Sequence, residues 1–317
     1  MLRAALRQSA RLRPLPRPLA GAWAGSACCA AVLGVLAPTA AAEAAEDFEE
    51  VPPEFDKDHY PDGINSNFVN DRPTEDVVRD FTKRFEDPES RDIARAWPAL
   101  VELLKGSFSL EGKTIADIGA GTGLFTKPFV EAVGPSGSVV SVELSEHFVQ
   151  HLGDMKAAAA PALDNVEVVQ CTDKSANLPE NSVDVAFICD VYHHLAFPRT
   201  FMRSLRRALR PGGFCVVIDF HRIPEKMTSH KPEWVLVHVR AGQEVFREEV
   251  VDAGFELVTE PELPELEENY IMVFTKPESE PAPASTKPAP ESSTPAGVDL
   301  SQFSTEALLQ ELESRLK

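Results

Sequence analysis

The feature that most constrains the fold is a glycine-rich stretch at residues 114–125. An apolar run ends at Asp117, and glycines then follow at every second position: Gly119, Gly121 and Gly123. The pattern predicts a buried strand, a sharp turn and the start of a helix, because glycine permits such a turn and lets a ligand approach the main chain. It does not match the dinucleotide fingerprint G-x-G-x-x-G/A, whose third small residue would fall on Leu124. A nicotinamide-dependent dehydrogenase is therefore disfavoured.

A second strand is predicted at residues 138–143, and it ends in an acid, Glu143. A carboxylate at the tip of a second strand is placed to accept both hydroxyls of a ribose. Leu144, the next residue, would offer an apolar face to an adenine ring. A helix is then expected to begin after Ser145 as its N-cap.

The rest of the core alternates between strands and helices. Strands are predicted at residues 165–171, 183–189, 214–220, 255–258 and 270–274. One helix is predicted to end near Lys105. A second is predicted to begin at Pro198 and to stop at residues 210–213, and a third to cover residues 242–253. This alternation predicts an α/β fold with a seven-stranded, mostly parallel sheet and helices on both faces.

Polar side chains gather where the fourth strand ends. Asp190, Tyr192, His193 and His194 follow that strand directly, and Asp219 ends the fifth strand. Ligands of open α/β sheets bind beyond the carboxyl ends of the strands, so we expect a substrate to bind beside these polar side chains. A metal is conceivable, but adjacent histidines usually diverge and no other ligand-spaced cluster supports one, so we expect none.

Several further motifs carry a family resemblance. They are residues 85–86 with 90–91, residues 116–123, the Asp-x-Tyr-His-His run 190–194, residues 209–213, the His-Val-Arg-Ala-Gly run 238–242, residues 253–255 and residues 268–270. Over residues 85–276 the chain resembles class I, Rossmann-like S-adenosylmethionine-dependent methyltransferases, and within them methylase type 11 proteins similar to the quinone-ring C-methyltransferases. The resemblance implies that the last strand lies antiparallel between its neighbours.

The resemblance also implies a cofactor and its site. S-adenosyl-L-methionine would be held by nine residues: Asp117, Gly119, Ala120, Gly121, Gly123, Glu143, Leu144, Asp173 and Asp190. Asp173 would contact the adenine amino group, although the usual Gly-Asp-Ala is replaced here by residues 171–173. The acceptor, a small molecule, would be bound and activated by five residues: Asp190, Tyr192, His193, His194 and His238. Arg240 would suit an acidic group on the acceptor, and pairing with an acid of the protein is the alternative.

The charge distribution suggests a targeting leader. The net charge is −19, yet the first 42 residues contain five arginines and no acid, so residues 43–317 carry −24. An acidic body repels phosphate backbones, and we expect no nucleic-acid substrate. Residues 1–42 are typical of an organellar leader, either a single transit peptide or one followed by a second signal; a weak membrane anchor is the third interpretation. Abundant arginine and scarce serine favour the mitochondrion over the plastid.

Five segments are expected. They are the leader (1–42), an acidic extension (43–88), the methyltransferase domain (89–276), a linker rich in proline, alanine and serine (277–299) and an amphipathic C-terminal helix (300–317). The three cysteines of the domain are expected to be buried and reduced. The extension and the C-terminal helix leave an alternative function open: a cofactor-binding assembly or regulatory protein that docks a partner through them.

Overall fold

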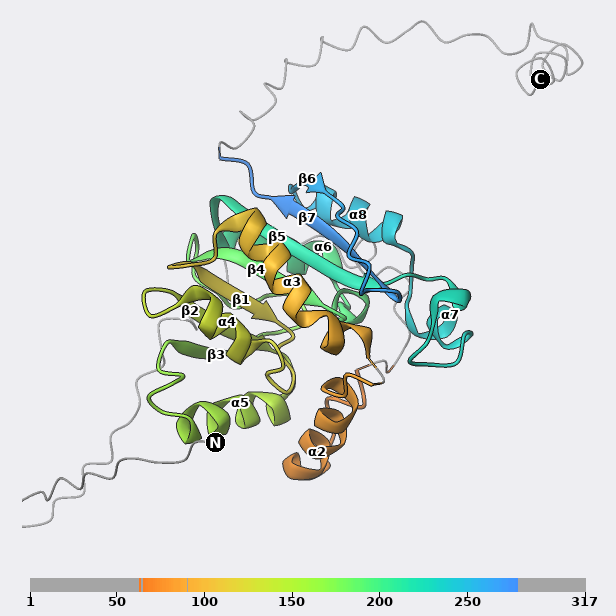
Figure 1. Ribbon diagram of the computed structural model, residues 1–317, viewed down its shortest axis with the longest axis horizontal. Coiled ribbons are helices and arrows are strands. Elements are labelled where there is room, and N and C mark those ends of the chain that lie inside the picture. Colours follow the sequence, from red (N-terminus) through yellow and green to blue (C-terminus); the bar gives the residue numbers. More distant parts are fainter. Residues whose placement is uncertain (1–62, 64, 90, 279–317) are drawn as a thin grey trace, which may run out of the picture. The chain divides into compact units, whose positions relative to one another are not determined.

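The computed structural model describes residue 63 and residues 65–89 and 91–278. Their centre is a seven-stranded sheet in the order β3-β2-β1-β4-β5-β7-β6 (Figure 1). The strands are β1 (Thr114–Ile118), β2 (Ser138–Glu143), β3 (Val166–Gln170), β4 (Val183–Cys189), β5 (Leu209–Phe220), β6 (Glu256–Thr259) and β7 (Asn269–Thr275). Strands β1 to β5 are parallel to one another, and β7 is antiparallel to both β5 and β6. The predicted fold class is confirmed.

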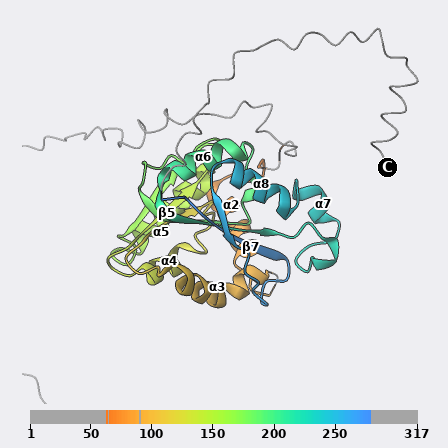
Figure 2. The same ribbon diagram turned by 90° about the horizontal axis from the view of Figure 1, so that it is seen from above.

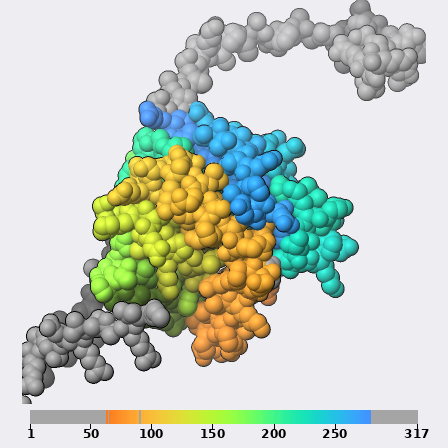
Figure 3. Space-filling view, in the orientation of Figure 1, coloured from red at the N-terminus to blue at the C-terminus, as the bar shows by residue number. Residues whose placement is uncertain are grey.

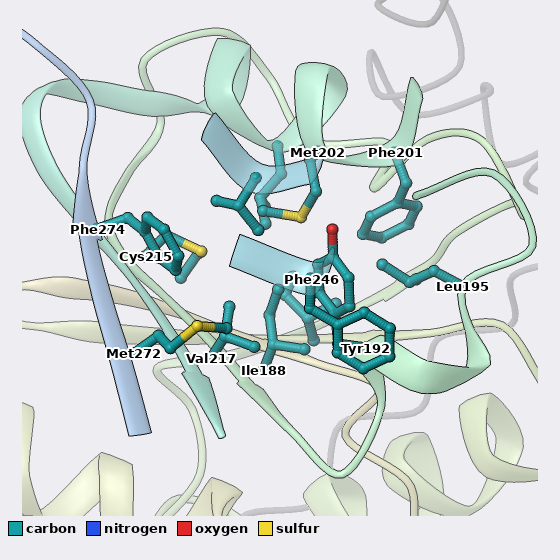
Figure 4. Close-up of a cluster of buried hydrophobic side chains, with 14 of the residues drawn as sticks. Ile188, Tyr192, Leu195, Phe201, Met202, Cys215, Val217, Phe246, Met272 and Phe274 are labelled. Atoms are coloured by element: carbon teal, nitrogen blue, oxygen red, sulfur yellow. The ribbon is translucent and has the colours of Figure 1, made fainter. Parts of the chain in front are cut away.

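Helices cover both faces of the sheet, as the view from above shows (Figure 2). On one face lie α3 (Asp92–Phe108) and α4 (Thr126–Val133), and on the other lie α6 (Pro198–Ala208) and α8 (Gln243–Asp252). Each face has its own core: Leu100, Phe129 and Phe187 belong to the first, and Phe201, Phe246 and Met272 to the second (Figure 4). A sheet buried on both faces explains why its strands are continuous apolar runs.

The predicted strands agree with the structure apart from small shifts in their ends. The second and fourth strands have the predicted bounds, and the first ends at Ile118, one residue beyond the predicted Asp117. The fifth begins earlier than predicted, at Leu209, so residues 210–213 lie within β5 rather than between helix and strand. The pairing of β4 with β5 shifts register between Val183 and Val185, which accommodates these extra residues.

The acidic extension contains a helix that the sequence did not predict. Residues 74–85 form the helix α2 (Thr74–Phe85), whose Val77 and Phe81 are buried against Phe148 of α5 (Glu146–Ala158). The spacing of these two apolar residues, i and i+4, is helical, but prolines and glycines upstream obscured it. Ser145 precedes α5 as predicted, yet its hydroxyl donates to the carbonyl of Phe68 (2.6 Å) and does not cap the helix.

Two short elements complete the carboxyl edge of the parallel strands. The 3₁₀ helix η3 (Tyr192–His194) follows β4, and α7 (Trp234–His238) follows β5 after a second 3₁₀ turn, η4 (Pro224–Lys226). Figure 3 shows α2 (orange) and the segment containing α7 (teal) on the surface near this edge. Among the described helices, none has the length and apolarity needed to cross a bilayer.

Several predictions fall outside the described residues. They concern the leader (1–42), the part of the extension before residue 63, the linker from residue 279 onward and the C-terminal helix. All of these stay predictions. The expected cysteines lie within the described part: Cys189 and Cys215 are buried, Cys171 is half-buried, and all three are free thiols.

Candidate active site

A pocket opens at the carboxyl ends of the parallel strands. One side is formed by the glycine loop after β1 and the tip of β2, and the other by η3 and α7. Phe68 and Phe85, from the segment before the domain, also line it. The pocket thus joins most of the predicted cofactor residues and most of the predicted acceptor residues in a single space, at the edge of the sheet where α/β folds bind their ligands.

The glycine loop has the backbone that its sequence predicts. Gly119 and Gly121 have positive φ angles of 69° and 54°. A Cβ atom on Gly119 would lie 2.5 Å from a methyl carbon of Val191, so that position also needs glycine for space. Gly119, Ala120 and Gly121 all line the pocket. Their main chain is therefore accessible to a bound ligand.

Glu143 connects the residues on the cofactor side of the pocket. One carboxylate oxygen accepts the amide N–H groups of Leu144 (2.8 Å) and Ser145 (2.9 Å), and the other accepts the N–H of Gly121 (2.9 Å). Burial raises the pKa of Glu143, and these three N–H donors oppose that rise because they favour the charged form. Glu143 therefore ties the second strand to the glycine loop. It lines the pocket together with Leu144 and the exposed Asp173.

Two predicted cofactor residues lie behind the loop and do not line the pocket. Asp117 is buried, and its carboxylate accepts the hydroxyl of Thr126 (3.4 Å), which also contacts the hydroxyl of Ser141 (3.0 Å). Burial raises the pKa of Asp117 to about 7. Gly123 has a φ of 83°, and a Cβ atom there would lie 2.9 Å from the terminal methyl carbon of Met155 in α5. Both residues support the loop from its buried side, so neither is placed to contact the cofactor directly.

Asp190 lies at the junction of the two sides of the pocket. Its φ is 53°, and its carboxylate is paired with the Arg91 guanidinium and accepts the side-chain N–H of Asn269 (2.5 Å). Burial raises the pKa of Asp190 to about 7, and Arg91 opposes the rise. The pair links the start of α3 to the tip of β4. Arg91, whose role the sequence left open, therefore has a defined partner.

His193 is held in one orientation by Asp219, the last acid of β5. Its Nδ1 lies 2.8 Å from one carboxylate oxygen of Asp219, and its backbone N–H donates to the other (3.1 Å). Only 1% of His193 is exposed, and burial lowers its pKa to about 3. The ring is neutral at physiological pH. Its second nitrogen, Nε2, lies on the side away from Asp219.

The adjacent histidines do not diverge. The ring centroids of His193 and His194 are 4.2 Å apart, and that of His238 lies 5.0 Å from the first and 5.1 Å from the second. The tight 3₁₀ turn of η3 keeps two consecutive side chains together, and α7 brings the third. Burial lowers the pKa of His238 to about 3 and that of His194 well below its usual value. All three line the pocket.

Tyr192 is not where the sequence analysis expected it. The side chain is fully buried in the core between the sheet, α6 and α8, and it packs on Phe246 with ring centroids 4.9 Å apart (Figure 4). It does not line the pocket. In the turn that follows β4, this side chain points into the sheet's core while the next two point to the pocket. A direct role in catalysis does not fit this placement.

Arg240 also pairs with a residue of the protein. Its guanidinium donates two hydrogen bonds to the carboxylate of Glu249 (2.7 and 2.5 Å), and both side chains are almost completely buried. Such a bidentate pair is a strong structural contact. The structure therefore favours the alternative given above, pairing within the protein, over recognition of an acidic acceptor.

Sequence reasoning did not assign several residues that line the pocket. Trp234 stacks on His230 (3.8 Å between centroids) and on His238 (4.3 Å), and Phe68 meets His194 edge-on (5.2 Å). Trp234 precedes His238 by four residues, a helical spacing that could have signalled a shared face. Phe68 comes from a segment without a recognisable motif, so only the fold reveals it.

Comparisons with known proteins agree with this geometry. Residues 116–217 match the family described as "Methyltransferase domain". The chain is 33% identical over 118 residues to the ubiquinone/menaquinone biosynthesis C-methyltransferase UbiE of Hahella chejuensis, covering 37% of this chain and 47% of that protein. It is 27% identical over 194 residues to the UbiE protein of Pseudomonas fluorescens, covering 54% and 75%. The first alignment therefore spans about half of the relative.

A solved structure shows the same fold. A methyltransferase from Aquifex aeolicus, described as dependent on S-adenosylmethionine, superposes with a TM-score of 0.53 and 22% identity, covering 65% of this chain and all of the other. The described part of the chain therefore has the fold of class I, Rossmann-like methyltransferases, and residues 116–217 match a methyltransferase domain, which supports S-adenosyl-L-methionine as the cofactor. These findings agree with the predicted fold and domain, and the finer subgroup stays a prediction. The individual roles of the site residues stay predictions.

Proposed function

We propose that the whole protein transfers a methyl group from S-adenosylmethionine to a ring carbon of a small, quinol-like aromatic acceptor. The observation that carries the proposal is the two-sided pocket, with Glu143 and the glycine loop opposite a wall of neutral histidines and aromatic rings. The two relatives named above, which are C-methyltransferases of ubiquinone/menaquinone biosynthesis, support the same choice.

The two sides of the pocket have different tasks. Glu143, Leu144 and the loop from Gly119 to Gly121 would hold the cofactor. When bound, S-adenosylmethionine supplies an electrophilic methyl group: the acceptor's carbon forms the new C–C bond, and the sulfur keeps the electrons of the broken C–S bond. Phe68 and His238 would stack on an aromatic acceptor and orient it, while Trp234, which stacks on His230 and His238, would support the His238 ring.

The acceptor must lose one proton overall. Loss from a ring hydroxyl makes the neighbouring carbon nucleophilic, and loss from that carbon restores the aromatic ring. His194 and His238 line the pocket and are the candidate acceptors of this proton, but burial lowers the pKa of both rings, so each would act only as a weak base. His193, fixed by Asp219, would position these two rings and fill the wall beside them.

The test is a methyl-transfer assay with the full chain. Benzoquinols and naphthoquinols that lack one ring methyl are incubated with S-adenosylmethionine, and the products are analysed by mass spectrometry and NMR. We expect a methyl group on a ring carbon, formed from the reduced quinol and not from the oxidised quinone, because only the quinol has a nucleophilic ring. Methylation of oxygen, nitrogen or sulfur alone would contradict the proposal, and a Gly121→Arg variant is the control for cofactor dependence.

We further propose that the protein works in the mitochondrion. The proposal is supported by the acid-free, arginine-rich sequence of residues 1–42. A fluorescent protein fused after residue 42 should enter mitochondria, and replacing the five arginines with glutamine should leave it in the cytosol. Import into plastids would favour the other organelle, and no import of either fusion would contradict a targeting role.

A further inference from the structure

Three histidines of the pocket form a compact cluster that the methyl-transfer reaction does not require as such. His193 and His194 come from η3, and His238 comes from α7. One ring nitrogen from each lies within 4.8 Å of the others. Methyl transfer from a sulfonium needs positioning more than a set of convergent nitrogen donors. The convergence therefore calls for a separate explanation.

Two nitrogens of this cluster are buried without a hydrogen bond. Nε2 of His193 and Nδ1 of His194 find no partner among the described residues. Buried polar atoms in proteins are almost always satisfied, and an unsatisfied one indicates a catalytic role or a bound water or ion. Here the two atoms belong to adjacent residues in one cluster, so a shared occupant accounts for both.

The hydrogen bond between His193 and Asp219 is the arrangement that metal-binding histidines use. A carboxylate on one ring nitrogen fixes the tautomer and leaves the lone pair of the other nitrogen available for a metal. Asp219 is itself fixed by the backbone N–H groups of Phe220 (2.7 Å) and His193 (3.1 Å). The lone pair on Nε2 of His193 therefore has a fixed direction.

The separation of the three nitrogens is compatible with coordination after a small adjustment. Atoms no more than 4.8 Å apart share a point that lies at most about 2.8 Å from each. Zinc–nitrogen bonds are about 2.0–2.1 Å, so each ring would move by less than about 1 Å. Rotation about the side-chain bonds of His194 and His238 supplies a movement of that size, while Asp219 holds His193 in place.

We propose that His193, His194 and His238 bind a divalent transition-metal ion, of the class represented by zinc. Three imidazole nitrogens suit zinc, iron, nickel or copper, whereas magnesium and calcium prefer oxygen ligands. Three protein ligands leave a coordination position open, and the pocket side of the cluster is where it would lie. A ring oxygen of the acceptor would fit that position, and the histidine nitrogens that hold the ion would then not serve as proton acceptors. This step rests on the proposed function; metal binding itself does not.

The proposal is tested by metal titration of the full chain. The purified protein is stripped with a chelator and titrated with Zn²⁺ against a chromophoric competitor, and separately with Co²⁺, whose visible absorption reports coordination. We expect one ion per chain and an X-ray absorption spectrum of the zinc form with nitrogen ligands in the first shell. Absence of stoichiometric binding by the folded wild type, or a first shell containing sulfur, would overturn the site.

Variants locate the ion. His193→Ala, His194→Ala and His238→Ala should each weaken Zn²⁺ binding at least tenfold, and Asp219→Asn about 10–100-fold because it acts through His193. His221→Ala is the matched control, since His221 follows β5 directly but does not line the pocket. Equal binding by the triple variant and wild type would overturn the proposal. Cofactor titration of the same samples keeps this result separate from the proposed methyl transfer, which requires S-adenosylmethionine binding whether or not a metal is held.

Discussion

At the scale of single residues, the cofactor side of the pocket depends on Glu143. Its carboxylate accepts hydrogen bonds from three backbone N–H groups and lines the pocket. An amide in its place has only one oxygen and cannot accept all three. We expect Glu143→Gln to weaken S-adenosylmethionine binding by roughly 10–100-fold, the equivalent of one or two hydrogen bonds to a charged group.

Calorimetric titration measures that change, with Glu167→Gln as control. Glu167 is an exposed acid on β3 that does not line the pocket, so its variant should bind as the wild type does. Full affinity in Glu143→Gln would show that the carboxylate does not contribute to the cofactor site.

The two glycines of the loop should differ in their tolerance of a side chain. A Cβ at Gly119 would overlap Val191, whereas at Gly121 the nearest atoms lie 3.8 Å away. Both substitutions strain a positive φ by about 1–2 kcal/mol, and only Gly119→Ala adds a steric clash. Thermal melts should therefore show a larger loss of stability for Gly119→Ala than for Gly121→Ala. Partial rescue of Gly119→Ala by Val191→Ala would support the clash, and equal losses in the two single variants would argue against it.

At the scale of elements, the partly buried pair of Arg91 and Asp190 joins α3 to the tip of β4. Removing one partner of a fully buried pair costs about 3–5 kcal/mol, and the cost here is smaller because Asp190 can take up a proton near neutral pH. Arg91→Met should lower the free energy of unfolding by about 1–3 kcal/mol, measured by urea denaturation. In the Arg91→Met/Asp190→Asn double variant the loss should be smaller, and additive losses would show that the two residues act independently.

Elements also show how far the sequence could be interpreted. The strands were predictable because their apolar runs are long and bounded by turn residues, and β4 was located to the residue. The helix α2 was missed because its pattern is short and follows a proline-rich segment. Tyr192 was misplaced and the adjacent His193 and His194 were expected to diverge, because the direction of each side chain is set by the 3₁₀ turn and by the distant α7. The spacing of residues along the sequence does not reveal that packing.

At the scale of the whole molecule, buried acids make the stability depend on pH. Asp117 has a usual pKa of 3.8 that burial raises to about 7, so the folded state holds a proton that the unfolded state has lost. Its contribution to stability is therefore largest at low pH and decreases as pH rises from about 4 to about 7. Asp117→Asn cannot ionise and should lack this decrease.

The measurement is urea denaturation of both proteins at pH 5 and pH 7.5. Raising the pH from 5 to 7.5 should lower the unfolding free energy of the wild type relative to that of Asp117→Asn, by on the order of a few kcal/mol. A difference that is the same at both pH values would mean that Asp117 is already ionised in the folded protein at pH 5.

The central claim is that the pocket binds S-adenosylmethionine through the glycine loop. Calorimetric titration of the full chain with this cofactor tests it most directly, with Gly121→Arg as the variant that places a bulky cation where the loop faces the pocket. We predict binding at one site per chain with micromolar affinity, lost in the variant while its fold is retained. Absence of binding by folded wild-type protein would contradict the account.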